Sequence, residues 1–110
     1  MQNIPSEMQS CIDACLRCYQ SCLDMAMNHC LEAGGKHVEP KHVKIMMSCA
    51  EFCRTSAHFM LVKSEHYKHA CRECAEICED CARSCEHVGG MQDCVDACRR
   101  CAESCQKMAA

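Results

Sequence analysis

The cysteines of this chain recur at alternating intervals of three and four residues, and this spacing limits the possible fold more than any other feature of the sequence. One run steps 4, 3, 4 from Cys11 to Cys22, a second steps 3, 4, 3, 4 from Cys71 to Cys85, and a third repeats the first pattern from position 94. A mean interval of 3.5 residues keeps each run on one face of an α-helix, whereas a strand requires a period of two. The sequence therefore predicts helices with one face lined by cysteine.

A fourth segment carries the same register with fewer cysteines. His42, Met46, Cys49 and Cys53 follow one another at intervals of four, three and four. In all four segments, sulfur and imidazole occupy the inward positions where leucine usually sits. The thiols of this inward seam belong to Cys11, Cys15, Cys18, Cys22, Cys49, Cys53, Cys71, Cys74, Cys78, Cys81, Cys85, Cys94, Cys98, Cys101 and Cys105.

The composition agrees with a helical bundle and includes few of the large aliphatic residues that form an ordinary hydrophobic core. The 110 residues include 16 cysteines, no tryptophan, two phenylalanines, two tyrosines, four glycines and two prolines. Few aromatic residues and few turn formers disfavour a β-sandwich or barrel, and the length suits one domain, residues 1–110. Once cysteine is set aside, the apolar residues are mainly alanine and methionine, so a conventional aliphatic core would be thin.

Capping and helix-breaking residues set the expected boundaries. We expect helices over residues 6–33, 40–63, 65–87 and 91–108. Short connections make successive helices antiparallel, so the predicted fold is all-α, an antiparallel up-down four-helix bundle with a Cys-lined core. The boundary signals are a capping box at Ser6–Gln9, glycine pairs at 34–35 and 89–90, Pro40 in a first helical turn, and a cap at Ser64–Glu65.

Charge and hydropathy exclude several classes of function. The formal net charge is −3, and the sequence has neither the clustered basic face of a nucleic-acid-binding protein nor the basic stripe that binds an anionic membrane. It also lacks an apolar run long enough for a transmembrane helix. The first residues do not resemble a secretory signal. We therefore expect a cytoplasmic protein with reduced thiols, and no nucleic-acid or membrane partner.

Three roles are available to so many inward thiols. As small hydrophobic residues they would bury less apolar area than leucine, so this role explains them poorly. As disulfides they would need Cβ atoms about 3.8 Å apart, whereas helical neighbours at i+3 and i+4 lie about 5–6 Å apart. Two such side chains can instead turn toward one ion between them. Metal binding is therefore the favoured interpretation.

The ligand types and their arrangement favour Cu(I). Thiolate, thioether and imidazole groups select Cu(I), zinc or iron–sulfur clusters, but zinc and iron–sulfur sites commonly take their cysteines from loops. A column of cysteines on unbroken helices suits a soft monovalent ion, and roughly one such ion per thiolate would neutralise the buried charge. Two alternatives stay open: a zinc or cadmium buffer with a metallothionein-like role, and an iron–sulfur electron-transfer protein. The sequence shows no nucleophile–base pair that would indicate an enzyme, and we expect no catalytic residues.

The Cys-x₃-Cys-x₂-Cys-x₃-Cys runs, the pair Cys49-x₃-Cys53 and the ending from Cys101 to Ala110 resemble the cytosolic four-helix-bundle copper storage proteins over essentially the whole chain. This resemblance implies a cytosolic homotetramer that binds many Cu(I) ions, with every seam cysteine as a ligand. It also makes a copper chaperone an expected partner. Family members extend the cysteine seam toward one end, where this chain has Met25, His29 and His42 instead.

That end of the bundle is predicted to be the mouth through which copper enters. The ends of the first and third helices meet the starts of the second and fourth there, and Met91 and His37 also belong to this end. Thioethers and imidazoles bind Cu(I) without carrying charge, so they can pass ions inward without trapping them. Met25 and His29 continue the register of the first helix, whereas Cys30 lies one position off it and is peripheral. His37 is expected to be solvated in the loop. The ligands expected at the mouth are Met25, His29, Cys30, His42, Met46 and His87.

A second apolar stripe runs beside the seam of the first helix. One interpretation is that it seals the bundle between adjacent helices, and the other is that part of it forms a homo-oligomer interface. Both can hold at once. The stripe consists of Ile12, Leu16, Tyr19, Leu23 and Met27.

Overall fold

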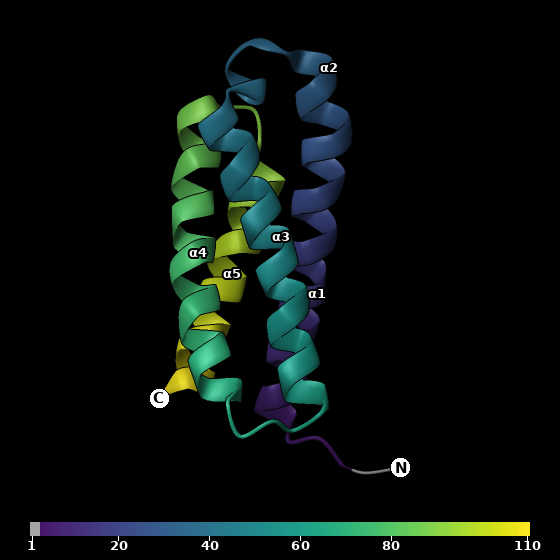
Figure 1. The fold of residues 1–110 in the computed structure, drawn as a ribbon, viewed down its shortest axis with the longest axis vertical. Helices are drawn as coiled ribbons and strands as arrows, with labels where there is room; N and C mark the ends of the chain where they lie inside the picture. Colours follow the sequence, from purple (N-terminus) through teal and green to yellow (C-terminus); the bar gives the residue numbers. More distant parts are fainter. Residues whose placement is uncertain (1–2) are drawn as a thin grey trace.

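Four rods of helix make up the computed structural model, which describes residues 3–110 (Figure 1). The first rod runs without a break through three consecutive helical elements, and a short 3₁₀ turn leads to the second. No rod end differs from the predicted boundary by more than two residues. The elements are α1 (Ser6–Asp24), the π-helix η1 (Met25–Cys30), α2 (Leu31–Ala33), the 3₁₀ turn η2 (Gly35–Val38), α3 (Pro40–Leu61), α4 (Tyr67–Val88) and α5 (Gln92–Ala109).

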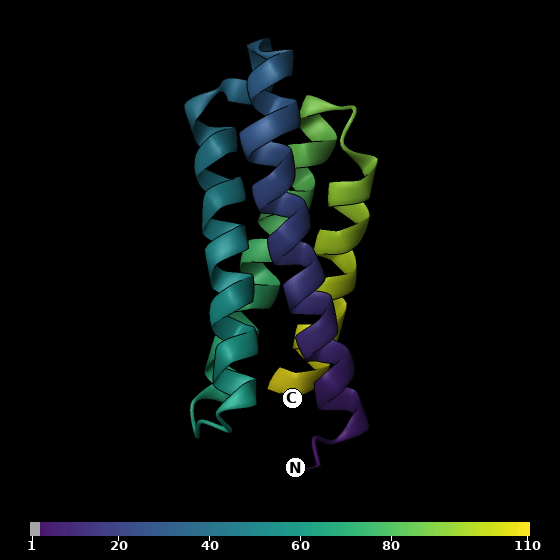
Figure 2. The same ribbon diagram turned by 90° about the vertical axis from the view of Figure 1, so that its right-hand side faces the viewer.

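The rods run up and down in chain order, as predicted. Each rod packs against the rods before and after it, and α5 returns to pack against α1, which closes the bundle (Figures 1 and 2). The molecule measures 46 × 25 × 19 Å, and the start of α1 and the end of α5 lie at the end opposite η2. Among the described residues, none of the helices combines the length and the apolar character needed to cross a membrane.

Several boundary signals act as expected. Pro40 is in the first turn of α3, where its missing N–H leaves no helical acceptor unpaired. Gly34 and Gly89 end the first rod and α4 with φ values of 67° and 84°, in the left-handed region that glycine enters at low cost. Between α3 and α4 the chain has no glycine, and Lys63 takes this conformation with φ 55°.

Two predicted caps are wrong. Ser6 does not cap the first rod, because it is already the first helical residue, and Pro5 precedes it in an extended conformation. The Gln9 side chain donates forward to Asp13 at 2.9 Å instead of reaching back. Ser64 does not cap α4 either, since its Oγ accepts the N–H of His66, before the helix begins.

A π-helical segment changes the register of the first rod. In a continuous α-helix, the eight residues from Cys22 to Cys30 would turn the second side chain by about 80° relative to the first. The wider turns of η1 take up this excess, because a π-turn holds one additional residue. The inward positions after Cys22 are therefore Ala26 and Cys30, which are 1% and 0% exposed.

Deletion of Met27, which is exposed, tests this role of η1. The deletion shortens the interval from Cys22 to Cys30 to seven residues, so an ordinary α-helix would still place Cys30 in the core. We expect native helix content by circular dichroism and no new thiol that reacts rapidly with a chromogenic thiol reagent.

Deletion of the exposed Arg17 in α1 is the matched control, because it turns Cys11 and Cys15 by about 100° relative to the rest of the seam and is expected to expose thiols. Rapid labelling of Cys30 after deletion of Met27 would contradict the assigned register.

Candidate metal centre

The interior of the bundle is a column of thiols. All sixteen cysteines are free, and none is more than 1% exposed. Neighbouring sulfur atoms lie between 3.5 Å (Cys53 to Cys78) and 4.0 Å (Cys49 to Cys53) apart, well beyond the length of a disulfide bond, about 2.05 Å. The seam predicted from the 3–4 spacing is confirmed as the core, and the expected absence of cystines agrees with the structure.

The spacing of these sulfur atoms suits shared metal ions. With metal–sulfur bonds of about 2.3 Å, three thiolates around one ion lie about 4.0 Å apart. Contacts across the bundle have this spacing: the Cys18 sulfur lies 3.8 Å from that of Cys49 and 3.7 Å from that of Cys98. Thiols from different rods can therefore converge on one ion without rearrangement of the backbone.

The thiols form overlapping groups along the bundle axis. Each group has sulfur atoms within 4.8 Å of one another and shares one or two members with the next. Because of this sharing, the groups make a continuous ladder instead of separate four-ligand cages. In order from the chain termini toward the mouth, the groups are Cys11–Cys71–Cys105, Cys15–Cys74–Cys101–Cys105, Cys53–Cys74–Cys78–Cys101, Cys18–Cys49–Cys53–Cys78 and Cys18–Cys22–Cys49–Cys98.

The column continues beyond these groups toward the mouth. The Cys22 sulfur lies 3.7 Å from that of Cys94 and 4.0 Å from that of Cys81. Hydrogen bonds with Cys81 and Cys94, together with burial, raise the pKa of the Cys85 thiol. Sulfur atoms thus reach from the terminal end of the bundle to the turn between α4 and α5.

Without metal, thiols in several parts of the column hold their protons, while hydrogen bonds with neighbouring thiols lower the pKa of others, such as Cys18 and Cys101. The pKa of Cys22 is raised first by hydrogen bonds with Cys18 and Cys49, and also by burial. Hydrogen bonds with neighbouring thiols, first of all with Cys101, and burial raise the pKa of Cys53 and of Cys105. A neutral thiol is the form that a buried site tolerates, because an uncompensated buried charge is costly. Metal binding at these positions therefore releases protons.

Cys30 is the centre of a mixed cluster at the mouth, and its predicted peripheral position is wrong. Its sulfur lies 3.9 Å from His42 Nε2, 4.0 Å from the Met46 sulfur and 3.9 Å from the Met91 sulfur. All four residues are buried. Burial, followed by the nearby Cys94 and Cys81, raises the pKa of Cys30. One thiol, one imidazole and two thioethers form a ligand set that Cu(I) favours.

His42 is held in a defined orientation. Its Nδ1 lies 2.7 Å from Ser84 Oγ, and burial lowers the pKa of the imidazole, which favours the neutral form at pH 7. When Nδ1 carries the proton and donates to Ser84, Nε2 presents its lone pair toward Cys30. Ser84 was not found from the sequence, because one serine on a helical face gives no signal of such a contact.

The other predicted mouth ligands do not join this cluster as expected. Met25 is half-buried and His29 is exposed, because η1 moves the inward register from these positions to Ala26 and Cys30. His29 stacks edge-on against His37, with ring centroids 5.1 Å apart. His37 is half-buried and its Nε2 is enclosed, so its predicted full solvation is wrong. His87 is exposed.

The opposite end of the bundle is closed by apolar side chains. Met60 is fully buried, and Met8 and Met108 pack against the core. His58, His66 and His69 are exposed. The mouth end differs in having a buried imidazole, that of His42, beside a buried thiol, that of Cys30.

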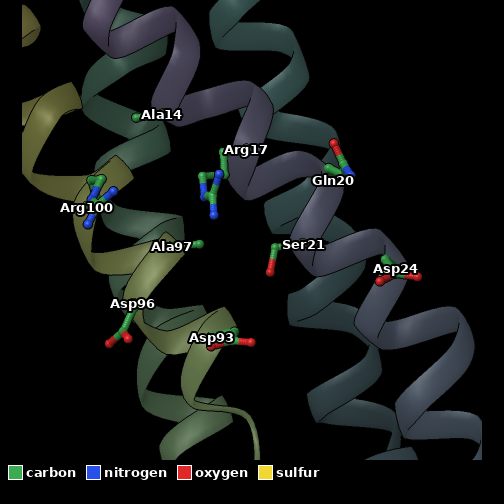
Figure 3. Close-up of a pocket in the computed structure, with 9 residues that line it drawn as sticks. All are labelled: Ala14, Arg17, Gln20, Ser21, Asp24, Asp93, Asp96, Ala97 and Arg100. Carbon is green, nitrogen blue, oxygen red and sulfur yellow. The ribbon is translucent and has the colours of Figure 1, made fainter.

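The surface carries a polar hollow of about 460 Å³ between α1 and α5. Figure 3 shows Arg17 on α1 and Arg100 on α5 on its two sides, with Asp93 and Asp96 on α5 and Asp24 on α1. Its lining contains neither sulfur nor imidazole, and charges of both signs alternate around it. This hollow lacks the soft ligands of the metal column.

Comparison with known proteins decides the family. A family model described as copper storage protein matches residues 4–110. The chain belongs to the copper storage protein family. This match confirms the family and the copper-storage function predicted from the cysteine runs. Among the curated proteins, none matches the chain.

Solved structures support the same assignment. A protein from Nitrosospira multiformis is 60% identical, with a TM-score of 0.92 and 94% of each chain covered. The Cu(I)-bound copper storage protein BsCsp3 is 33% identical, with a TM-score of 0.88 over 96% of this chain and 100% of that one. Apo copper storage protein 3 from Bacillus subtilis is 34% identical, with a TM-score of 0.82 over 93% and 98% of the two chains. The similarity to these solved structures, together with the structure of the chain itself, thus confirms the predicted four-helix bundle.

Proposed function

We propose that this member of the copper storage protein family stores Cu(I) as many ions bound to cysteine thiolates inside the bundle. The observation that carries the proposal is the continuous ladder of buried free thiols, in which neighbouring groups share members. Soft thiolate ligands suit Cu(I), and a monovalent ion that replaces one thiol proton leaves the buried core neutral. The proposed ligands are the fifteen seam cysteines listed above, together with Cys30.

The same arrangement supports storage without catalytic turnover. A catalytic metal site has a defined ligand set and an open coordination position for substrate. In the column, every sulfur is buried and seven cysteines belong to two groups each. A filled core of this kind offers capacity and retention, and it leaves no position for a reacting molecule.

The mixed cluster at the mouth is proposed as the first buried binding site for an entering ion. Cys30 contacts His42, Met46 and Met91, and its pKa responds to Cys81 and Cys94 of the main column. Because three of its four ligands are uncharged, an ion there is held less strongly than among thiolates. Met25, His29 and His87 lie outside this cluster, at the rim of the mouth.

We place the protein in the cytoplasm, where such a core can stay reduced. All sixteen cysteines are free, and reducing compartments maintain free thiols, whereas oxidising compartments convert them to disulfides.

Anaerobic titration with Cu(I) in the presence of a chromogenic Cu(I) chelator tests the storage function. We expect uptake on the order of one ion per cysteine, because one monovalent ion per thiolate neutralises the core. The loaded protein should be colourless, with thiolate-to-copper charge-transfer bands in the near ultraviolet. Saturation after one or two ions, or a brown product with iron, would contradict Cu(I) storage.

We also propose that the chain forms a homo-oligomer, a tetramer as the family resemblance suggests. Leu16, Met27 and Leu31 lie along the outer face of the first rod and are 42%, 41% and 57% exposed, so they offer an apolar surface to other copies. Leu16→Glu combined with Leu31→Glu is expected to yield monomers in sedimentation analysis. Leu61→Glu, at an equally exposed leucine on α3, is the control. Unchanged mass for the double variant would contradict this interface.

A further inference from the structure

A basic groove of about 750 Å³ opens between α3 and α4 at the mouth end of the bundle. Arg83 pairs with Asp80, whereas within residues 3–110 the groove's three lysines take part in none of the ion pairs. The groove is therefore positively charged on a chain whose formal net charge is −3. The charged side chains that line it are Lys36, Lys41, Lys44, Arg83, Glu39 and Asp80.

His42 joins this groove to the metal column. His42 lines the groove although it is only 4% exposed, and Ser84, which orients its imidazole, also lines the groove. The Nε2 atom of His42 lies 3.9 Å from the Cys30 sulfur. His42 is thus the one proposed metal ligand between a molecule bound in the groove and the first buried thiol, Cys30.

From this juxtaposition we propose that the groove binds the carrier that brings Cu(I), and that this carrier is a small thiol bearing a carboxylate, bound to copper through its sulfur. Two thiolates on one Cu(I) give an anionic complex, and each carboxylate adds negative charge. Lysine ammonium groups attract such a complex at long range. This inference rests on the proposed storage function and adds the class of molecule from which the ion is taken.

The transfer is an exchange of ligands without oxidation or reduction. One of the two carrier sulfurs leaves copper as a thiolate, which takes a proton from solvent, as His42 Nε2 forms its bond to the ion. The second carrier sulfur remains attached. The Cys30 sulfur then forms its bond to copper as the bond to the carrier sulfur breaks. The proton of the Cys30 thiol passes to the departing thiolate, so the carrier leaves as a neutral thiol group. Copper remains Cu(I) throughout.

Other openings near the column lack this combination. The hollow beside Met25 and Met91 carries Glu86 and Asp93, which would repel an anionic complex. The hollow in Figure 3 mixes both signs of charge and has no soft ligand. The groove above His42 therefore offers both attraction for an anion and a ligand for its copper.

Loading rates from three matched carriers test the proposal. Cu(I) is presented anaerobically as its complex with 3-mercaptopropionate, 2-mercaptoethanol or cysteamine, which are anionic, neutral and cationic at the end remote from sulfur. For the wild-type protein we expect the ratio of the loading rate from 3-mercaptopropionate to that from cysteamine to fall as salt is added, because salt screens the lysines. Succinate without copper is expected to slow loading from the anionic complex by occupying the groove.

Charge-matched variants locate the effect. Lys41→Gln combined with Lys44→Gln should lower the ratio of the loading rate from 3-mercaptopropionate to that from cysteamine by about five-fold or more. The control combines Lys68→Gln with Lys107→Gln, which changes the net charge equally at exposed positions outside the groove. This control should keep the ratio near the wild-type value. His42→Ala should slow loading from all three carriers. Total copper capacity should stay unchanged in both lysine pairs.

Two outcomes would overturn the proposal. Equal loss of the rate ratio in both lysine pairs would show that net charge, and not the groove, sets the preference. Rapid loading only from a protein donor, with slow loading from all three thiol complexes, would show that the groove serves a macromolecule. A low final copper content would instead contradict the storage function itself, so the two failures are distinguishable.

Discussion

The copper-free protein is expected to unfold in mildly alkaline solution, between about pH 8.5 and pH 10, while the Cu(I)-loaded protein stays folded. An unfolded chain ionises its cysteines above about pH 8.5. In the fold, hydrogen bonds with neighbouring thiols and burial raise the pKa of Cys22, Cys53 and Cys105. The folded state therefore keeps protons that the unfolded state has released, which makes unfolding progressively easier as the pH rises.

The sign and size of this effect follow from proton linkage. The stabilisation is complete below the unfolded pKa and is lost as the pH rises toward the raised pKa of the folded state. Each such thiol lowers the free energy of unfolding by about 1.4 kcal/mol per pH unit. Several thiols acting together over one to two pH units reach the roughly 5–15 kcal/mol by which a typical domain is stable. In the loaded protein the thiolates already bind metal and have no proton to lose.

Far-ultraviolet circular dichroism during an anaerobic pH titration measures both states. The copper-free sample should lose helix within this range and regain it when returned to pH 7 with reductant. The loaded sample is the control, since it has the same sequence and differs only in its core. Helix retained by the copper-free protein to pH 10, or loss of helix at the same pH in both samples, would show that the core thiols do not limit stability.

Zinc uptake is expected to stop at about two ions per chain, several-fold below the uptake of Cu(I). A structural zinc ion takes four ligands of its own. In the ladder, two four-thiol groups share Cys18 and Cys49, and two others share Cys74 and Cys101. At most two of the four-thiol groups can therefore be filled at once without a shared thiol, whereas Cu(I) sites can use two or three thiolates each.

Competition between the protein and a chromogenic zinc chelator gives the zinc plateau, and Cu(I) added afterwards should displace the zinc completely. Cys30→Ser is a suitable control variant, because Cys30 belongs to none of the four-thiol groups and its loss should leave the zinc plateau unchanged. Zinc uptake that equals Cu(I) uptake would favour the zinc or cadmium buffer over copper storage.

The sequence predicts the rods and their inward faces well, because both depend on a local repeat. The alternating intervals fix which side of each helix carries sulfur, and the glycine pairs and Pro40 fix where rods stop and start. It fails at the π-helix, where Met25 and His29 fit the α-helical register but Ala26 and Cys30 occupy it. A π-turn inserts one additional residue so that the side chains on both sides of it pack into the same core. This requirement comes from packing along the whole helix, so the sequence around the π-turn carries no local pattern that reveals it.

The sequence by itself determined a four-helix bundle with a thiol-lined interior and ligands suited to soft metal ions, because a period of 3.5 residues and the chemistry of cysteine are properties of single segments. Only the tertiary structure decided which thiols share an ion, that Cys30 meets His42, Met46 and Met91, and that a basic groove leads to them. These features join atoms of different rods, so they depend on how the helices are rotated and spaced against one another.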